Sequence, residues 1–347
     1  MFGSTVAAMG PLCLVTVSGG LLAHLGILNK SSNDTIAKAS QKLLLPAFVF
    51  INIVKGVDFA NVAEWWSLLV VPVLAIAIAS VVGVVHTLAF NPPEHVKYTM
   101  NSLLIFANLG NVPVLLVEGA CASYGPINGE PSCPDAASLI FLQVITFNVL
   151  AWSYGFGLVY LDYLKKEPTE GTPSFSLKKM ILKQIFGPLP NAVYFGCVIG
   201  SIPGVKYLVT DSDAPLLVIY DALYTIGYAG IVLSQMILGS NIWLSRKLER
   251  TMSKRYIASV VFLRCVVITG LGVLIMWWFY DLGVFGDDIV MAYVSLMNFI
   301  SPSTIFITLI CQILDTGIQE TATILFWMYL AAFISITFAG YTFFLLI

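Results

Sequence analysis

Long apolar runs constrain this chain more than any other feature. Ten of them fill nearly the whole sequence, each about 20 residues long, which is enough for a helix to cross the hydrocarbon core of a membrane. They lie at about 5–28, 38–57, 65–90, 98–118, 136–161, 180–202, 214–241, 256–280, 288–313 and 320–346. Only 10% of the 347 residues are charged, against roughly 25% in a soluble domain. The sequence therefore predicts an all-α polytopic membrane protein with ten transmembrane helices and no sizeable soluble domain.

The basic residues predict the orientation of the chain, because cytosolic loops of membrane proteins are enriched in Lys and Arg. With ten spans, 14 of the 17 basic residues fall on one face. Only Lys55 and Lys206 fall on the other face, and Arg264 lies within the eighth span. We therefore expect the basic face to be cytosolic and both termini to be lumenal. Two glycosylation sequons, at Asn29 and Asn33, fall on the cytosolic face, so we expect them to stay unmodified.

Cysteine positions agree with this orientation. Cys121 and Cys133 lie in the loop after the fourth span, on the predicted non-cytosolic face. An oxidising compartment would permit a disulfide between them, and two free thiols are the alternative. The other four cysteines lie in apolar spans, where we expect them to act as small packing residues.

The polar segment 162–179 divides the ten spans into five and five. We predict a first five-helix repeat at 1–161, a short cytosolic linker at 162–179 and a second five-helix repeat at 180–347. An odd number of spans in each repeat would invert one repeat relative to the other in the membrane. The tripeptide Gly-Pro-Leu opens both the first and the sixth span, which are corresponding members of the two repeats.

Two corresponding spans are also interrupted. "NLGNVP" (108–113) breaks the fourth span, and "NFISPST" (298–304) breaks the ninth. Interruptions at matching positions of inverted repeats point to the binding site of a transporter. Two ordinary proline kinks are the alternative. We favour broken helices that cross at a site, because uncompensated polar groups at that depth are costly.

The polar residues of the spans suit a small organic anion with an apolar body. A broken span exposes the N-terminus of its second half, where free N–H groups favour an anion, and amide side chains can complete its hydrogen bonds. Arg264 is expected to hold carbonyls or an acid across helices or to snorkel to the cytosolic interface, with substrate contact as the minority alternative. The predicted substrate-binding residues are Asn52, Asn108, Gly110, Asn111, Pro113, Gln143, Asn148, Ser301, Pro302, Ser303 and Thr304.

The sequence contains no recognisable catalytic motif. HExxH, CxxC and GxSxG patterns are absent, and the three histidines lie near predicted span ends. Acidic residues are almost all at span ends or in loops, which argues against a carboxylate proton relay. We therefore expect no enzyme activity, no cofactor, no metal and no nucleic-acid partner.

The stretch "FNPPEHVKYTMNSLLIFANLGNVPVLLVEGAC" (90–121) resembles the PIN-LIKES branch of the auxin efflux carrier family. The shared features are the Pro-Pro turn, the Asn-x-Gly-Asn-x-Pro break and the following Ala-x-Cys. "LGSN" (238–241), "SPST" (301–304) and "ETATILFWMYL" (320–330) extend the resemblance over the rest of the chain. The sequence departs from it at three places: Ala107 stands where the family carries Gly, the seventh span reads "YAGIVLSQM" without the family's usual Pro, and Cys265 follows Arg264 where the family carries Pro.

This resemblance implies a ten-span inverted-repeat carrier in which spans 4 and 9 cross at the midplane. Spans 1, 2, 6 and 7 would form a scaffold that dimerises, and spans 3–5 and 8–10 a moving transport domain. The substrate would be indole-3-acetate or a similar small hydrophobic carboxylate, carried from the cytosol to the lumen of the endoplasmic reticulum by alternating access. Asn111 and Asn108 would hold its carboxylate. The expected partners are this substrate, membrane lipid and a second copy of the chain, with the plasma membrane as the alternative location.

Two other interpretations stay open. One is a carrier of a different organic anion, perhaps coupled to sodium, since carbonyls and amides can also hold that ion. The other is a membrane sensor with a carrier fold that binds the ligand without moving it. Sodium-independent binding of an indole acid, and flux in proteoliposomes, would separate them from the favoured interpretation.

Overall fold

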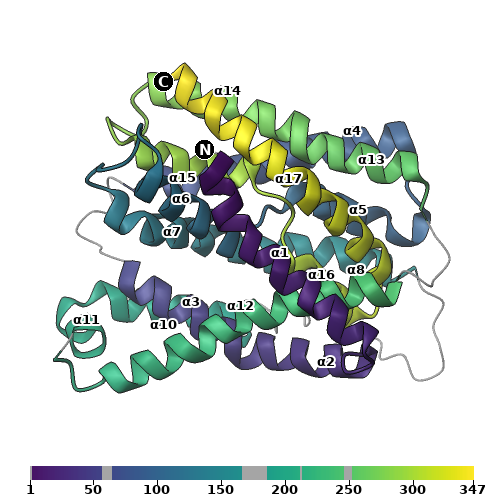
Figure 1. The fold of residues 1–347 in the computed structure, drawn as a ribbon, viewed down its shortest axis with the longest axis horizontal. Coiled ribbons are helices and arrows are strands. Elements are labelled where there is room, and N and C mark those ends of the chain that lie inside the picture. The colour runs from purple at the N-terminus through teal and green to yellow at the C-terminus, as the bar shows by residue number, and fades with distance from the viewer. Residues whose placement is uncertain (1, 57–64, 166–185, 212, 246–251) are drawn as a thin grey trace.

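The computed structural model describes residues 2–56, 65–165, 186–211, 213–245 and 252–347. Apart from one isolated β-bridge, these residues form helices and their connections, as expected for an all-α membrane protein (Figure 1). Six helices are long and apolar enough to cross a membrane, or seven if a pair bent by 108° counts as one span. They coincide with predicted spans 2, 3, 5, 7, 8 and 10 and cover Lys30–Gly56, Trp66–Phe90, Ser138–Tyr163, Leu217–Leu244, Lys254–Asp281 and Ile318–Leu346.

The first half of the chain contains eight described α-helices. They are α1 (Phe2–His24), α2 (Lys30–Ala39), α3 (Leu45–Gly56), α4 (Trp66–Phe90), α5 (Lys97–Ile105), α6 (Asn111–Ser123), α7 (Ala136–Leu150) and α8 (Phe156–Tyr163). Short π-helical segments make α2 continuous with α3 (Ser40–Leu44) and α7 continuous with α8 (Ala151–Gly155). Short 3₁₀ turns, Glu94–Val96 and Cys133–Asp135, precede α5 and α7.

The second half is built in the same way. Its α-helices are α10 (Pro188–Ser201), α11 (Pro203–Thr210), α12 (Leu217–Ser245), α13 (Lys254–Phe262), α14 (Thr269–Asp281), α15 (Ile289–Ile300), α16 (Phe306–Leu314) and α17 (Ile318–Leu346). A π-helical segment, Leu263–Ile268, joins α13 to α14, and α10 with α11 forms the bent pair. The predicted linker lies mostly outside the described residues, and α8 continues through its first two positions.

The predicted start of the second span, near residue 38, is wrong. The helix begins at Lys30, because Asn29 and Ser32 form a capping box there. The polar residues at the start of this helix did not predict a membrane-embedded segment. Asn33 is nevertheless buried, and its amide Nδ2 donates to Ser240 Oγ and Asn241 Oδ1, each at 2.9 Å. This burial also keeps the sequon at Asn33 inaccessible to a glycosylating enzyme, which agrees with the expectation that it stays unmodified.

Helices from the two halves pack against each other. α1 lies against α12, and α3 lies against both α10 and α12, so that α3, α10, α11 and α12 run along one side of the molecule (Figure 1). α4 packs against α5 and α7, while α14 packs against α15 and α17. The contacts α1–α6, α3–α7 and α12–α17 join these two groups. The division into scaffold and transport domain stays a prediction.

The two ends of the spans differ in chemistry. On the predicted non-cytosolic face, Cys121 and Cys133 form a disulfide, with their Cα atoms 5.7 Å apart. On the predicted cytosolic face, Lys97 and Lys165 lie 3.5 and 3.4 Å from the carboxylate of Glu94. The hydrogen bond from Lys165, together with the charge of Lys97, lowers the pKa of Glu94. Of the two alternatives for these cysteines, a disulfide or two free thiols, the structure contains the disulfide.

Candidate functional site

Both predicted interruptions are real gaps between helices. α5 ends at Ile105 and α6 begins at Asn111, while α15 ends at Ile300 and α16 begins at Phe306. The backbone N–H of Asn108 donates to Pro302 O at 2.7 Å, and that of Thr304 donates to Phe106 O at 2.9 Å. Together these bonds form a short antiparallel bridge centred on Ala107 and Ser303. The two breaks therefore cross and satisfy each other's backbone groups, as buried backbone requires.

Ala107 replaces the family's glycine without strain. The only described non-glycine residues with positive φ are Asn91 and Asp315, so Ala107 has a conformation open to any L-residue. Its pairing partner, Ser303, donates its hydroxyl to Phe106 O at 3.3 Å. A glycine is not needed at position 107 to form this crossing.

Arg264 holds the ends of two half-helices. Its guanidinium donates to Leu104 O at 3.0 Å, to Asn298 O at 3.1 Å and to Ser301 O at 2.8 and 3.1 Å. These carbonyls belong to the C-terminal ends of α5 and α15, where four carbonyls lack helical partners and the helix dipole is negative. Arg264 is only 1% exposed, and no carboxylate among the described residues lies within ion-pair distance. Of the roles considered for it, the structure confirms that it holds carbonyls.

Asn108 ties the first break to the last helix. Its Oδ1 accepts from Gly110 N at 3.0 Å, and its Nδ2 donates to the hydroxyl of Tyr329 on α17 at 2.7 Å. Tyr329 therefore lies at the crossing, although the sequence did not predict it as a site residue because it stands in an apolar run. The available signal was its hydroxyl, which needs a partner when buried.

At the second break, Asn298 links α15 to α7. Its Nδ2 donates to Ser295 O at 2.9 Å and to Gln143 Oε1. Gln143 Nε2 then has no hydrogen-bond partner within the described part of the chain, and the same holds for Asn148 Nδ2 and Trp152 Nε1. All three side chains are at most 5% exposed. Unpaired buried donors are uncommon in folded proteins and need an explanation.

The remaining predicted residues divide into those at the crossing and those apart from it. Gly110 is the N-cap of α6, and Pro113 lies in its first turn, where proline is tolerated. Asn111 opens α6, and its side chain lies outside the described part of the structure. Asn52 donates to Phe48 O of its own helix at 2.7 Å, and among the described residues no side-chain hydrogen bond joins it to the breaks. Ser301, Pro302 and Thr304 lie in the second break, where Thr304 Oγ1 accepts from Phe306 N at 3.2 Å.

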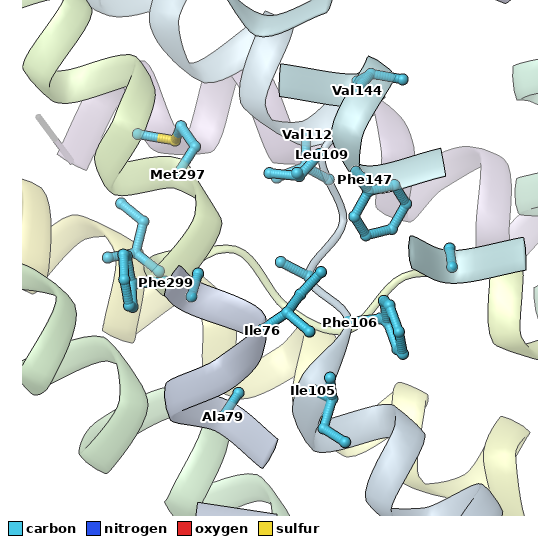
Figure 2. Close-up of a cluster of buried hydrophobic side chains, with 14 of the residues drawn as sticks. Ile76, Ala79, Ile105, Phe106, Leu109, Val112, Val144, Phe147, Met297 and Phe299 are labelled. Carbon is cyan, nitrogen blue, oxygen red and sulfur yellow. The ribbon is translucent and has the colours of Figure 1, made fainter. Parts of the chain in front are cut away.

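Apolar side chains enclose the crossing. Phe106 and Phe147 meet edge to face with ring centroids 5.9 Å apart, and Trp152 meets Phe306 in the same manner at 4.5 Å. Figure 2 shows further side chains of this cluster around the breaks, among them Leu109, Val112, Met297 and Phe299. The crossing is thus a polar strip of backbone and amides in apolar surroundings, which suits an anion with a hydrophobic body.

Comparison with known proteins decides the family. A family model described as "Membrane transport protein" matches residues 4–339, nearly the whole chain. The chain belongs to this membrane transport family. The chain is also similar to Arabidopsis thaliana Protein PIN-LIKES 3, with 24% identity over 329 residues, 84% of each chain. Protein PIN-LIKES 1 and Protein PIN-LIKES 7 of the same plant are 23% and 22% identical, covering 97% and 93% of this chain and 78% and 93% of their own.

The similarity to these relatives, together with the family match, confirms the resemblance to PIN-LIKES proteins. It also indicates transport rather than catalysis as the activity of this chain. The relatives match across both halves, so the two breaks and the helices that carry them lie within the shared region.

Proposed function

We propose that this protein is a carrier that moves indole-3-acetate, or a similar small hydrophobic carboxylate, from the cytosol to the lumen of the endoplasmic reticulum by alternating access. The observation that carries this proposal is the pair of broken helices bonded to each other through Ala107 and Ser303. Broken helices at a membrane midplane are tolerated where they line a site, and they expose helix N-termini that favour anions.

The unpaired donors support an acceptor ligand. Gln143 Nε2, Asn148 Nδ2 and Trp152 Nε1 are all N–H donors, and all come from the continuous helix α7–α8. A carboxylate only accepts hydrogen bonds, so it is a suitable partner for any of these donors that faces the crossing. Arg264 adds a buried positive charge without an acidic partner among the described residues, which makes the crossing favourable for an anion.

The carrier would cross the membrane ten times. The six long helices supply six crossings, and α1, the bent pair α10–α11 and the two broken pairs α5–α6 and α15–α16 would supply the other four. Ten crossings in two inverted halves, lumenal termini and a homodimer formed through α1, α3, α10 and α12 complete the proposal.

A flux assay tests the site. Purified protein in proteoliposomes is assayed for uptake of labelled indole-3-acetate, with and without sodium and with an imposed potential. Gln143→Leu should lower uptake roughly 10- to 100-fold, since a hydrogen bond to a charged group contributes about 1.5–3 kcal/mol. Asn111→Ala should lower it as well. Gln235→Leu is the matched control, because Gln235 is equally buried but lies on α12, where its Oε1 accepts from Thr16.

Other outcomes of the flux assay would assign this protein a different function. Saturable binding without flux would make this chain a sensor, and flux that requires sodium would make it a cation-coupled carrier. Equal uptake by the Gln143→Leu and Gln235→Leu variants would show that the substrate does not bind at the crossing.

A further inference from the structure

A large groove, lined by none of the predicted substrate-binding residues, lies on the surface of the second half. It has a volume of about 1530 Å³ and runs between the continuous helix α13–α14 and α17, with Ile242 of α12 at one end. Pockets for small molecules measure roughly 300–1,000 Å³, so this groove is large for a solute. From Lys254 to Leu274 it extends along about 20 residues of helix, roughly 30 Å, the thickness of the hydrocarbon core.

The groove has a floor of small residues and walls of large ones. Beneath it the two helices touch, where Ser335 Oγ of α17 donates to Cys265 O. Gly270 of α14 also lines the groove and is exposed, and a Cβ atom added to it would meet nothing within 4 Å. The walls rise as Phe262 on one side and as Trp327 and Phe338 on the other, which are 56%, 51% and 71% exposed. A slot of this shape fits a flexible chain of methylene groups.

Polar groups gather at one end of the groove. Lys254, Gln319, Glu320 and Thr323 lie at the predicted cytosolic end, where Glu320 bonds to His95 at 3.2 Å. Lys254 is exposed and has no ion-pair partner among the described residues. The lining beyond Thr323 is apolar over most of its length. The charged end of the groove matches the headgroup of a phospholipid, and the long apolar slot matches its acyl chain.

We propose that this groove binds an anionic phospholipid of the cytosolic leaflet, with its net-negative headgroup at Lys254 and an acyl chain along the slot over Gly270. Basic side chains at the cytosolic surface attract anionic headgroups, and filling the slot restores the close contacts that a void would lose. Because α12 and α17 both line the groove, the lipid would touch helices of the predicted scaffold and of the predicted transport domain together.

Native mass spectrometry of the purified protein in detergent tests the proposal. Dioleoylphosphatidylserine and dioleoylphosphatidylcholine are added at equal concentration, and the wild-type protein should retain phosphatidylserine preferentially. Gly270→Leu should displace the bound lipid by filling the slot. Gly157→Leu is its control, because a Cβ on Gly157 also meets nothing within 4 Å but lies on α8, outside the groove.

A second pair of variants tests the headgroup. Lys254→Gln should lower the retention of phosphatidylserine about fivefold, the attraction expected from one basic residue, and leave that of phosphatidylcholine unchanged. Lys38→Gln, a change of another exposed lysine of the predicted cytosolic face, should have no effect. Equal retention of both lipids by the wild type, or unchanged retention by Gly270→Leu, would overturn the proposal. So would disulfide-linked dimers of a Gly270→Cys variant in lipid bilayers, since a second copy would then occupy the groove.

Discussion

At the scale of single residues, Arg264 is a buried charge that bonds to backbone carbonyls and has no acidic partner in the part of the chain that the structure describes. Three carbonyls at the ends of α5 and α15 would otherwise lack partners, and leaving each one unpaired costs about 1–3 kcal/mol. The planar guanidinium reaches all three, which an ammonium group cannot do because it is a compact point donor on a flexible stem. Arg264 therefore positions the two breaks and does not need to touch the substrate.

Two substitutions of Arg264 should lower the stability of the protein to different extents. Arg264→Met should lower the melting temperature in detergent strongly, because the carbonyls of Leu104, Asn298 and Ser301 lose their donors. Arg264→Lys should fall between this variant and the wild type, since it keeps the charge and some of the donors. Melting temperatures followed by tryptophan fluorescence check the order. A Lys variant as unstable as the Met variant would contradict the role assigned to the donors.

At the scale of elements, close contact between helices depends on a few glycines. Gly272 of α14 faces Phe299, the next-to-last residue of α15, and an added Cβ would overlap the phenylalanine Cβ and ring. Gly270, two residues earlier, faces the open groove. The same helix thus packs against the second broken span on one side and leaves a slot on the other.

This difference predicts opposite effects of the same substitution. Gly272→Ala should destabilise the protein by about 1–3 kcal/mol through overpacking against Phe299. Gly270→Ala should be neutral or stabilise by up to about 1 kcal/mol, because alanine favours the helix and meets no neighbour. Thermal unfolding of the two variants side by side provides the measurement. Equal shifts in melting temperature would show that Phe299 does not limit the packing of α14.

At the scale of the whole molecule, independent features agree on one orientation. The disulfide of Cys121 and Cys133 lies on the face that the basic residues leave nearly empty. The ion pairs of Glu94 and the contact of His95 with Glu320 lie on the opposite face. The predicted orientation is thus compatible with both the basic residues and the disulfide.

Epitope tags at the two termini test this orientation. In sealed microsomes, both tags should resist added protease and become sensitive only after detergent is added, because both termini are predicted to be lumenal. A tag inserted between residues 170 and 171 of the predicted cytosolic linker is the control and should be cleaved without detergent. Cleavage of only one terminal tag in sealed vesicles would mean an odd number of spans.

Much of this molecule is predictable from its pattern of apolar runs. Six of the ten predicted spans and both breaks appear in the structure as the sequence predicts, because a helix in hydrocarbon needs about 20 apolar residues and any interruption is costly. The start of the second span was predicted too late, because the first turns of α2 are polar. Asn33 in those turns is nevertheless buried against Ser240 and Asn241. Tyr329 and Trp152 escaped notice for the converse reason, since aromatic residues in an apolar run give no sign of the partner they will meet.

Local composition was enough to predict the apolar segments, the two breaks within them and the distribution of basic residues. Each of these properties depends on residues that are neighbours along the chain. The bonds of Asn108 to Tyr329 and of Asn298 to Gln143, and the contacts of Arg264 with the ends of α5 and α15, became apparent only from the folded structure. Such partners lie up to 221 positions apart along the chain, and only the packing of the helices brings them within hydrogen-bonding distance.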